Sequence, residues 1–317
     1  MISSVKVSIV IPVYNGADFV NDAINSALSQ TYKNIEILVV NDGSTDGGAT
    51  EEVTRKYGNR IRYFFQPNGG VASALNLAIS EMKGEYFSWL SHDDLYQPEK
   101  VEAQVEALSR LGVQKSVSYC DYSVFGTDPI KAIPVDLEAG APEEFRYWLT
   151  TRNALHGCTL LIPRIAFDEC GGFDQSLLAT QDYDLWFRMA EHYQFLHLPR
   201  NLVLARSHPN QDSRSKAALA KEECNRLLAR FARELRESEI LGTAPPEALP
   251  SRLAGISASM FRRRFFRAGY DTILLAIVTL RPRGWYAILT YMFLWPPRAV
   301  SSMLVLILKA LFRIVKR

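Results

Sequence analysis

The sequence of 317 residues has few cysteines, no internal repeat and no apolar run long enough to cross a membrane. The missing repeat argues against solenoids and propellers. The absence of a C-x-x-C pair argues against a zinc site or a disulfide framework, and favours reduced thiols. The four cysteines are Cys120, Cys158, Cys170 and Cys224. A strand pattern begins almost at once, so we expect no signal peptide and a cytoplasmic location.

Charge is unevenly distributed, although the net charge is only +2. Residues 251–317 contain 12 Lys and Arg and one acid, whereas residues 1–250 contain 24 basic and 33 acidic residues, a net charge of −9. A basic tail on a mildly acidic body indicates an anionic partner, either a membrane surface or a nucleic acid.

Residues 1–115 alternate between strand-like and helix-like patterns. The first run, VKVSIVIPV at 5–13, is β-branched and apolar except at Lys6 and Ser8, which is typical of a strand buried on both faces. The alternation predicts an α/β fold with a mostly parallel sheet flanked by helices. Strands are expected at 5–13, 35–40, 61–65 and 85–90, and helices at 19–28, 51–57, 71–82 and 98–111.

The pattern loosens after residue 115. Strands are expected near 117–122 and within 156–162, and an amphipathic helix is expected from about 181 to 192. Residues 213–240 form a charged helical stretch, and GTAPPEALP at 242–250 is typical of a linker.

Polar residues follow three of the expected strands. These stretches are Tyr14-Asn15-Gly16, Asn41-Asp42-Gly43 and Ser91-His92-Asp93-Asp94. Because parallel strands bind ligands at their carboxyl ends, Asp42, Asp93 and Asp94 are expected to converge on one crevice. Two adjacent aspartates are by themselves more typical of a solvated loop or a helix N-cap. Their convergence with a third acid suggests a metal site, a catalytic base, or both.

Five segments, in this order and spacing, resemble the inverting family 2 glycosyltransferases of GT-A fold, over roughly residues 5–210. They are VSIVIPVYNGADFVNDAINSALSQTY, EILVVNDGSTDG, NGGVASALNLAI, SHDD and TQDYDLWFRM. With WLSHDDLY, HGCTLLIP and RSHPNQDS, the chain resembles most the members that build cell-surface polysaccharides.

The resemblance implies a site for the donor nucleotide. Asp42 is at the position where the family's acid accepts a hydrogen bond from N3–H of uracil or thymine, and Pro12 and Tyr14 would line the base pocket. UDP and dTDP present the same edge to Asp42, so both remain open as donors. The alternative is that Asp42 and Gly43 only form a turn.

The resemblance also implies a divalent cation, Mg²⁺ or Mn²⁺, that bridges the donor diphosphate. The family's L-D-x-D-D pattern is Leu90 to Asp94 here, with Ser91 in place of the first acid. Asp93 and Asp94 are the implied metal ligands, and Asp93 is also implied to bind the donor. In the late R-x-H element, Arg206 is implied to contact the diphosphate and His208 the metal. A structural histidine is the alternative for His208.

Inverting transfer needs one carboxylate to accept the proton of the attacking hydroxyl. The resemblance implies that Asp182 in the Gln181-Asp182 pair is this base, while Gln181 and His156 would contact the acceptor. The alternative for Asp182 is a favourable interaction with the dipole of a helix start, worth about 0.3–1 kcal/mol. A structural histidine is the alternative for His156.

The basic tail fits a membrane surface better than a nucleic acid. The apolar segments at 284–295 and 299–308 are each shorter than the ~20 residues that span a bilayer. From residue 300 onward, apolar and basic residues occupy different helical faces, which is typical of an interfacial helix. A helix packed on the protein or on a dimer partner is the alternative.

These observations predict three regions: a catalytic domain, a helix and linker at 213–250, and a membrane-associating region at 251–317. The catalytic domain is expected at 1–212, with a nucleotide-sugar half at about 1–115 and an acceptor half at about 116–212. We expect a metal-dependent inverting glycosyltransferase on the cytoplasmic face of the membrane, peripheral or monotopic. The donor would be a UDP- or dTDP-sugar, and the acceptor would be a glycan linked to polyprenyl diphosphate. We expect no nucleic-acid partner, and the oligomeric state is open. A non-catalytic nucleotide-sugar-binding or scaffolding subunit is the alternative.

Overall fold

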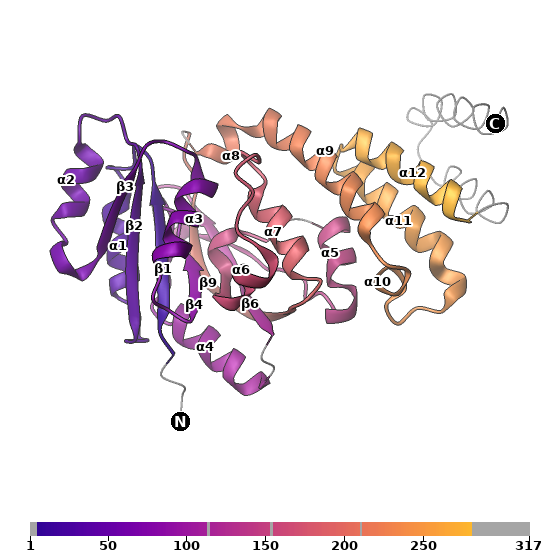
Figure 1. The fold of residues 1–317 in the computed structure, drawn as a ribbon, viewed down its shortest axis with the longest axis horizontal. Coiled ribbons are helices and arrows are strands. Elements are labelled where there is room, and N and C mark those ends of the chain that lie inside the picture. The colour runs from indigo at the N-terminus through magenta and orange to yellow at the C-terminus, as the bar shows by residue number, and fades with distance from the viewer. Residues whose placement is uncertain (1–4, 113–114, 153–154, 210, 281–317) are drawn as a thin grey trace. The chain divides into compact units, whose positions relative to one another are not determined.

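The computed structural model describes residues 5–112, 115–152, 155–209 and 211–280 (Figure 1). They form two compact units. The first contains residues from 1–142 and 154–223, and the second contains residues from 143–153 and 224–317. Each unit is described by itself.

The first unit begins with four neighbouring parallel strands in the order β3-β2-β1-β4, in the indigo and violet part of Figure 1. They are β1 (Val7–Val13), β2 (Ile35–Asp42), β3 (Arg62–Gln66) and β4 (Tyr86–Trp89). The connecting helices are α1 (Val20–Leu28), α2 (Ala49–Arg55) and α3 (Val71–Glu81). In α1 the buried residues recur at helical spacing, which explains why this segment packs as an amphipathic helix. They are Val20, Ala23, Ile24 and Ala27.

The rest of the sheet is mixed, so the expectation of a mostly parallel sheet holds only for β1 to β4. Strands β8 and β7 each pair antiparallel with β6, β8 also pairs antiparallel with β4, and β6 and β9 are parallel. Only a short turn region separates β6 from β7. Because parallel neighbours need a crossover of a dozen residues or more, these two strands can pair only in the antiparallel direction. These strands are β5 (Leu95–Tyr96), β6 (Ser116–Phe125), β7 (Ile133–Val135), β8 (Leu160–Pro163) and β9 (Gln194–Arg206).

The long strand β9 was not expected from the sequence. Its run contains Pro199, and proline within a run argues against a strand inside a sheet. The β6–β9 pairing shifts register between Cys120 and Tyr122, where Leu198 and Asn201 of β9 pair with neighbouring residues of β6. Pro199 lies in this irregularity, where no ladder hydrogen bond is required of it.

The first unit also contains α4 (Lys100–Leu111), α6 (Ile165–Cys170) and α7 (Gln181–Met189). An aromatic cluster joins α7 and the loop after α6 to the sheet: Phe173 lies 6.3 Å from Phe87, 6.1 Å from Trp89 and 5.9 Å from Trp186 between ring centroids. Such clusters bury large apolar areas. The carboxyl end of β4 and the start of α7 are therefore held by one core.

The second unit is helical. A buried ion pair, in which Arg146 donates to both oxygens of Glu239 at 3.1 and 3.2 Å, joins α5 to α10. Helices α11 and α12 pack against each other and bury Ile256, Met260 and Ala268. The helices are α5 (Phe145–Thr151), α10 (Glu237–Leu241), α11 (Leu249–Arg262) and α12 (Phe266–Leu280), and α9 (Ala217–Glu234) continues into this unit from the first, after the short α8 (Asp212–Ser215).

The expected linker at 242–250 contains a short 3₁₀ helix (Pro246–Ala248) and the first residues of α11. The apolar segments at 284–295 and 299–308, and the amphipathic pattern after residue 300, lie outside the described residues. Among the helices that the structure does describe, none combines the length and apolarity needed to cross a bilayer.

Candidate active site

The loops after β1 and β4 meet at the carboxyl edge of the sheet. The chain passes from β1 to β2 on one side, while β4 lies on the other side of β1, so the strand order reverses here. Ligands of open α/β sheets bind at such a point. A Cβ on Gly16 would lie 2.4 Å from Cδ2 of His92, so only glycine allows this approach of the two loops.

Asp42 lies at the end of β2 and is 4% exposed. Its Oδ1 accepts hydrogen bonds from Gln66 (2.6 Å) and the Gly69 N–H (2.9 Å), and its Oδ2 accepts one from the Gly70 N–H (2.8 Å). Asp42 therefore fixes the loop before α3. A carboxylate offers about four acceptor positions, so it retains capacity for one further donor such as an imide N–H.

The two neighbouring carboxylates face different partners. Asp93 Oδ2 lies 2.9 Å from His208 Nε2. Arg206 Nε donates to the backbone oxygen of Asp93 at 2.9 Å, and its guanidinium lies over the rings of Phe19 and Phe125. The late R-x-H element, 112 residues or more away in sequence, thus lies directly against the aspartate loop.

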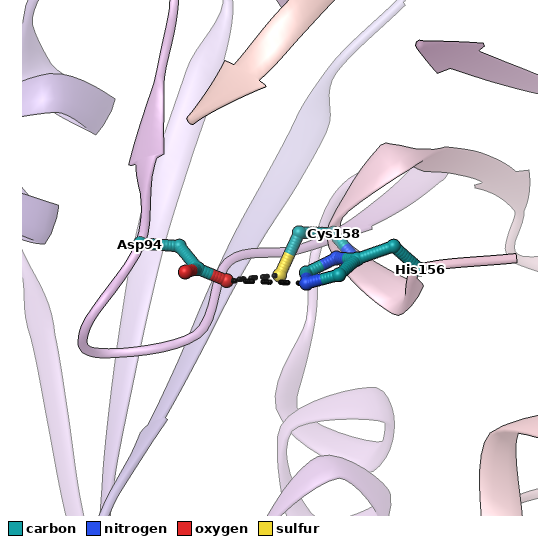
Figure 2. Close-up of side chains that lie close together, drawn as sticks. All are labelled: Asp94, His156 and Cys158. Carbon is teal, nitrogen blue, oxygen red and sulfur yellow. Dashed lines mark hydrogen bonds and ion pairs between the residues drawn. The ribbon is translucent and has the colours of Figure 1, made fainter. Parts of the chain in front are cut away.

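Asp94 faces His156 and Cys158, which lie just before β8 (Figure 2). Its Oδ1 accepts a hydrogen bond from the Arg206 N–H at 2.9 Å. Its Oδ2 lies 3.4 Å from Cys158 Sγ and 3.6 Å from His156 Nε2. Burial, and secondarily the charge of Asp93, raises the pKa of Asp94 well above that of an ordinary carboxyl.

A pocket of about 280 Å³ opens beside Asp94. Its lining combines aromatic faces, small groups and one carboxylate. The lining residues are Trp89, Ser91, Tyr122, Leu155, His156, Gly157, Cys158 and Asp182. Gly157 packs on the Trp89 ring, and a Cβ there would lie 2.3 Å from it. This volume suits one ring-sized polar ligand, and the apolar walls with few polar groups are typical of a small-molecule site.

Asp182 lies in the first turn of α7 and lines this pocket. Its Oδ1 accepts a hydrogen bond from the Tyr183 N–H at 2.9 Å. Burial raises the pKa of Asp182 to about 6. Burial also lowers the pKa of His156, so this imidazole is neutral near pH 7. A carboxylate of raised pKa beside a pocket has the properties of a general base.

A buried carboxylate outside the pocket holds the loop before α7. Glu223, 1% exposed, accepts hydrogen bonds from the Leu178 N–H (3.0 Å), the Ala179 N–H (3.1 Å) and the Thr180 hydroxyl (2.8 Å). These contacts fix the start of the helix that carries Asp182.

The other expected residues have more varied surroundings. Pro12 is buried within β1, and Tyr14 is 44% exposed beyond its end. Gln181 is 5% exposed, and its Oε1 has no hydrogen-bond partner among the described residues. Gln181 is not part of the pocket lining, although it precedes Asp182 in α7.

Sequence reasoning missed Cys158, Trp89, Tyr122 and Glu223. Cys158 was grouped with scattered thiols, although its spacing from His156 ahead of a strand is a usable signal. Trp89 and Tyr122 lie near the ends of expected strands and could have been placed at the sheet edge. Glu223 lies in a charged helical stretch, where nothing in the pattern distinguishes it from its neighbours.

Comparisons with known proteins show which proteins this chain is similar to. Residues 8–171 match the model of Glycosyl transferase family 2, a span that contains Asp42, Asp93 and Asp94 and ends before Asp182. An uncharacterized glycosyltransferase of Rickettsia conorii is 45% identical over 244 residues, which are 74% of this chain and 39% of that protein. The chondroitin synthase of Pasteurella multocida is 34% identical over 194 residues, 61% of this chain and 20% of that protein. The chain thus spans well under half of either relative.

Solved structures share the fold. S. aureus TarS 1–349 in complex with UDP-GlcNAc has a TM-score of 0.57 at 17% identity, covering 89% of this chain and 87% of that one. The mannosyltransferase PcManGT of Pyrobaculum calidifontis, in complex with GDP-Man and Mn²⁺, has a TM-score of 0.55 at 18% identity, covering 96% and 86%. The expected GT-A type of fold is confirmed, with a mixed sheet in place of a mostly parallel one. Because the family model matches more than half of its length, the chain belongs to glycosyl transferase family 2.

Proposed function

We propose that this protein is a metal-dependent, inverting glycosyltransferase that uses a UDP- or dTDP-sugar in cell-surface polysaccharide synthesis. The observation that carries the proposal is the position of Asp182: a carboxylate of raised pKa lines the same pocket as Ser91 and Cys158, which adjoin Asp93 and Asp94. The proposed base and Ser91, the residue that opens the aspartate loop, therefore border one cavity of about 280 Å³. The chondroitin synthase relative supports the polysaccharide context.

The residues present fit a bound Mg²⁺ or Mn²⁺. Asp93 Oδ2 and His208 Nε2 lie 2.9 Å apart, and Asp93 Oδ1 accepts no hydrogen bond from the residues that the structure describes. Magnesium is typically held by one or two carboxylates plus substrate phosphates, and manganese accepts the same ligands. Asp93 and His208 would hold the ion, which when bound would neutralise charge on the departing nucleoside diphosphate. The Mn²⁺ in PcManGT agrees with this choice.

Asp182 would accept the proton of the acceptor hydroxyl as that oxygen attacks C1 of the donor sugar. One C–O bond then forms as the bond to the diphosphate breaks on the opposite face, which inverts the configuration. Neutral His156 borders the same pocket and can orient the hydroxyl. Trp89 and Tyr122 offer flat apolar faces to the acceptor ring.

The raised pKa of Asp182 predicts the acid limb of the pH profile. The carboxyl must be ionised to accept a proton, so kcat/KM is expected to fall as pH decreases through about 6, rather than through about 4, the ordinary pKa of an aspartate side chain. The profile would be measured from pH 5 to 8, with nucleotide binding followed in parallel to exclude loss of the donor. An acid limb centred near pH 4 would contradict the assignment.

The donor class can be tested by calorimetric titration of the full chain with UDP, dTDP and GDP, each with and without Mn²⁺ or Mg²⁺. The proposal predicts metal-dependent binding of UDP or dTDP and weaker binding of GDP, because guanine presents a different edge to Asp42. Tightest binding of GDP would overturn the choice of base. Absence of binding for all three would favour a scaffolding role.

We further propose that the acceptor is a glycan on a polyprenyl diphosphate lipid and that residues 251–317 hold the protein on the cytoplasmic face of the membrane. The support is the charge pattern, 12 basic residues against one acid among apolar segments. Flotation of the full chain with vesicles is expected to recover it with anionic and not with neutral lipid. Equal recovery with both, or with neither, would contradict membrane attachment through this charge pattern.

A further inference from the structure

We propose that Asp94, His156 and Cys158 form a binding site for Zn²⁺, next to the Asp93–His208 pair and distinct from it. Figure 2 shows the three side chains directed at one another from two loops, one after β4 and one before β8. Their ligand atoms all lie within 4.8 Å of one another. Sulfur, nitrogen and oxygen donors together select zinc-like ions over Mg²⁺, which prefers oxygen alone.

The two separations that involve Asp94 match those around a zinc ion. Bonds of ~2.0–2.3 Å at tetrahedral angles place ligand atoms roughly 3.3–3.8 Å apart. Asp94 Oδ2 lies 3.4 Å from Cys158 Sγ and 3.6 Å from His156 Nε2. The first contact is a hydrogen bond from the thiol and the second is too long for a hydrogen bond between nitrogen and oxygen, and both need little change to hold an ion.

The surroundings orient the carboxylate and leave a coordination position accessible. Asp94 Oδ1 is held by the Arg206 N–H, so Oδ2 is the oxygen turned toward the thiol and imidazole. His156 and Cys158 both border the pocket, so water or an acceptor hydroxyl can supply the fourth ligand.

Binding requires two proton movements. The Cys158 thiol releases its proton to solvent, and the proton of neutral His156 moves from Nε2 to Nδ1 so that Nε2 can bind the ion. The 3.3 Å contact from the Cys158 N–H to Nδ1 is then lost. It is a weak hydrogen bond, and the new bonds to zinc offset it.

A Zn²⁺ ion in this position would occupy the pocket that Asp182 lines. On the proposed function, it would therefore inhibit transfer even when Mg²⁺ is present. This consequence rests on the proposed function, whereas the binding of the ion does not.

The test uses Co²⁺ in place of Zn²⁺ on the full chain under reducing conditions. A thiolate ligand gives a sulfur-to-cobalt charge-transfer band in the near ultraviolet, and a four-coordinate ion gives intense visible bands. We expect both kinds of band in the wild type. We also expect both in the control variant Cys170→Ser, which removes a cysteine that is more exposed than Cys158 and lies outside the proposed site. We expect the charge-transfer band to be lost in Cys158→Ser and kept in His208→Ala.

Absence of the band in the wild type, or its persistence in Cys158→Ser, would overturn the site. Loss of the band in His208→Ala, with Cys158→Ser unaffected, would place the ion at Asp93. If Cys158→Ser does not fold, His156→Gln takes its place: it keeps the sulfur and is expected to bind Co²⁺ more weakly with altered visible bands. Unchanged affinity and spectrum in His156→Gln would contradict the proposal.

Inhibition is measured separately. In the presence of Mg²⁺, Zn²⁺ is expected to lower transfer by the wild type by a larger fraction than transfer by Cys158→Ser, each relative to its own rate without Zn²⁺. A Cys158-dependent cobalt band in a chain without transfer activity would support the zinc site and contradict the proposed function. Active transfer without such a band would support the proposed function and contradict the zinc site.

Discussion

Replacing Asp182 with asparagine is expected to abolish sugar transfer while leaving nucleotide binding intact. Asparagine preserves the shape of the side chain and cannot accept the proton of the acceptor hydroxyl. A positioned general base contributes about 10²–10⁴-fold to rate, so a loss of that size is expected in kcat. Transfer would be measured with labelled donor, and nucleotide binding by calorimetry.

Asp184→Asn provides the matched control in the same helix. Asp184 is buried and pairs with Arg188 at 2.8 Å, so its loss is expected to lower the melting temperature and to leave most of the transfer rate. Asp182→Asn with near wild-type transfer would remove Asp182 from the chemistry. A common effect of both variants on stability alone would reduce Asp182 to a residue of the helix start.

The second large effect is expected at Asp93. Asp93→Asn should weaken metal-dependent UDP binding by about 2–5 kcal/mol, the usual cost of removing one partner of a buried charge pair. This corresponds to ~30-fold or more in Kd. The reason is geometric: Asp93 faces His208 and retains an oxygen without a described partner, so it is the carboxylate available to an ion.

Asp94→Asn separates the two carboxylates. Asp94 Oδ1 already accepts the Arg206 N–H, and Oδ2 faces Cys158 and His156, so this variant is expected to retain metal-dependent UDP binding. Titrations of the Asp93→Asn and Asp94→Asn variants with UDP and Mn²⁺ decide which of the two carboxylates holds the ion. Loss of binding in Asp94→Asn with retention in Asp93→Asn would show that the wrong carboxylate has been chosen.

The sequence predicted the first half of the fold well because its signals are local. Strands β1 and β2 are rich in β-branched apolar residues, and helix α1 has apolar residues at helical spacing. Strand β9 was missed because Pro199 contradicts a strand locally, and only the irregular β6 partner accommodates it. The residues of β6 and β9 that pair are more than 70 positions apart in the sequence, so the pairing leaves no pattern within either segment.

The candidate site likewise contains residues that local motifs predict and contacts that depend on distant parts of the chain. The aspartate loop, His156, Asp182, Arg206 and His208 could be named from motifs, and the structure brings them to one edge of the sheet. The sequence could not separate Asp93 from Asp94, because adjacent residues in a loop face directions set by distant partners. Nor could it show that three N–H groups already bind Asp42, since these come from the side chain of Gln66 at the end of β3 and from the loop before α3.

The most direct test of the whole account is transfer itself. The full chain would be incubated with a panel of labelled UDP- and dTDP-sugars, Mn²⁺ and a lipid-linked glycan extract, and the anomeric configuration of any product would be read by NMR. The account predicts metal-dependent transfer from one of these donors with inversion at C1. Binding of UDP or dTDP without transfer from any donor, or transfer with retained configuration, would contradict it.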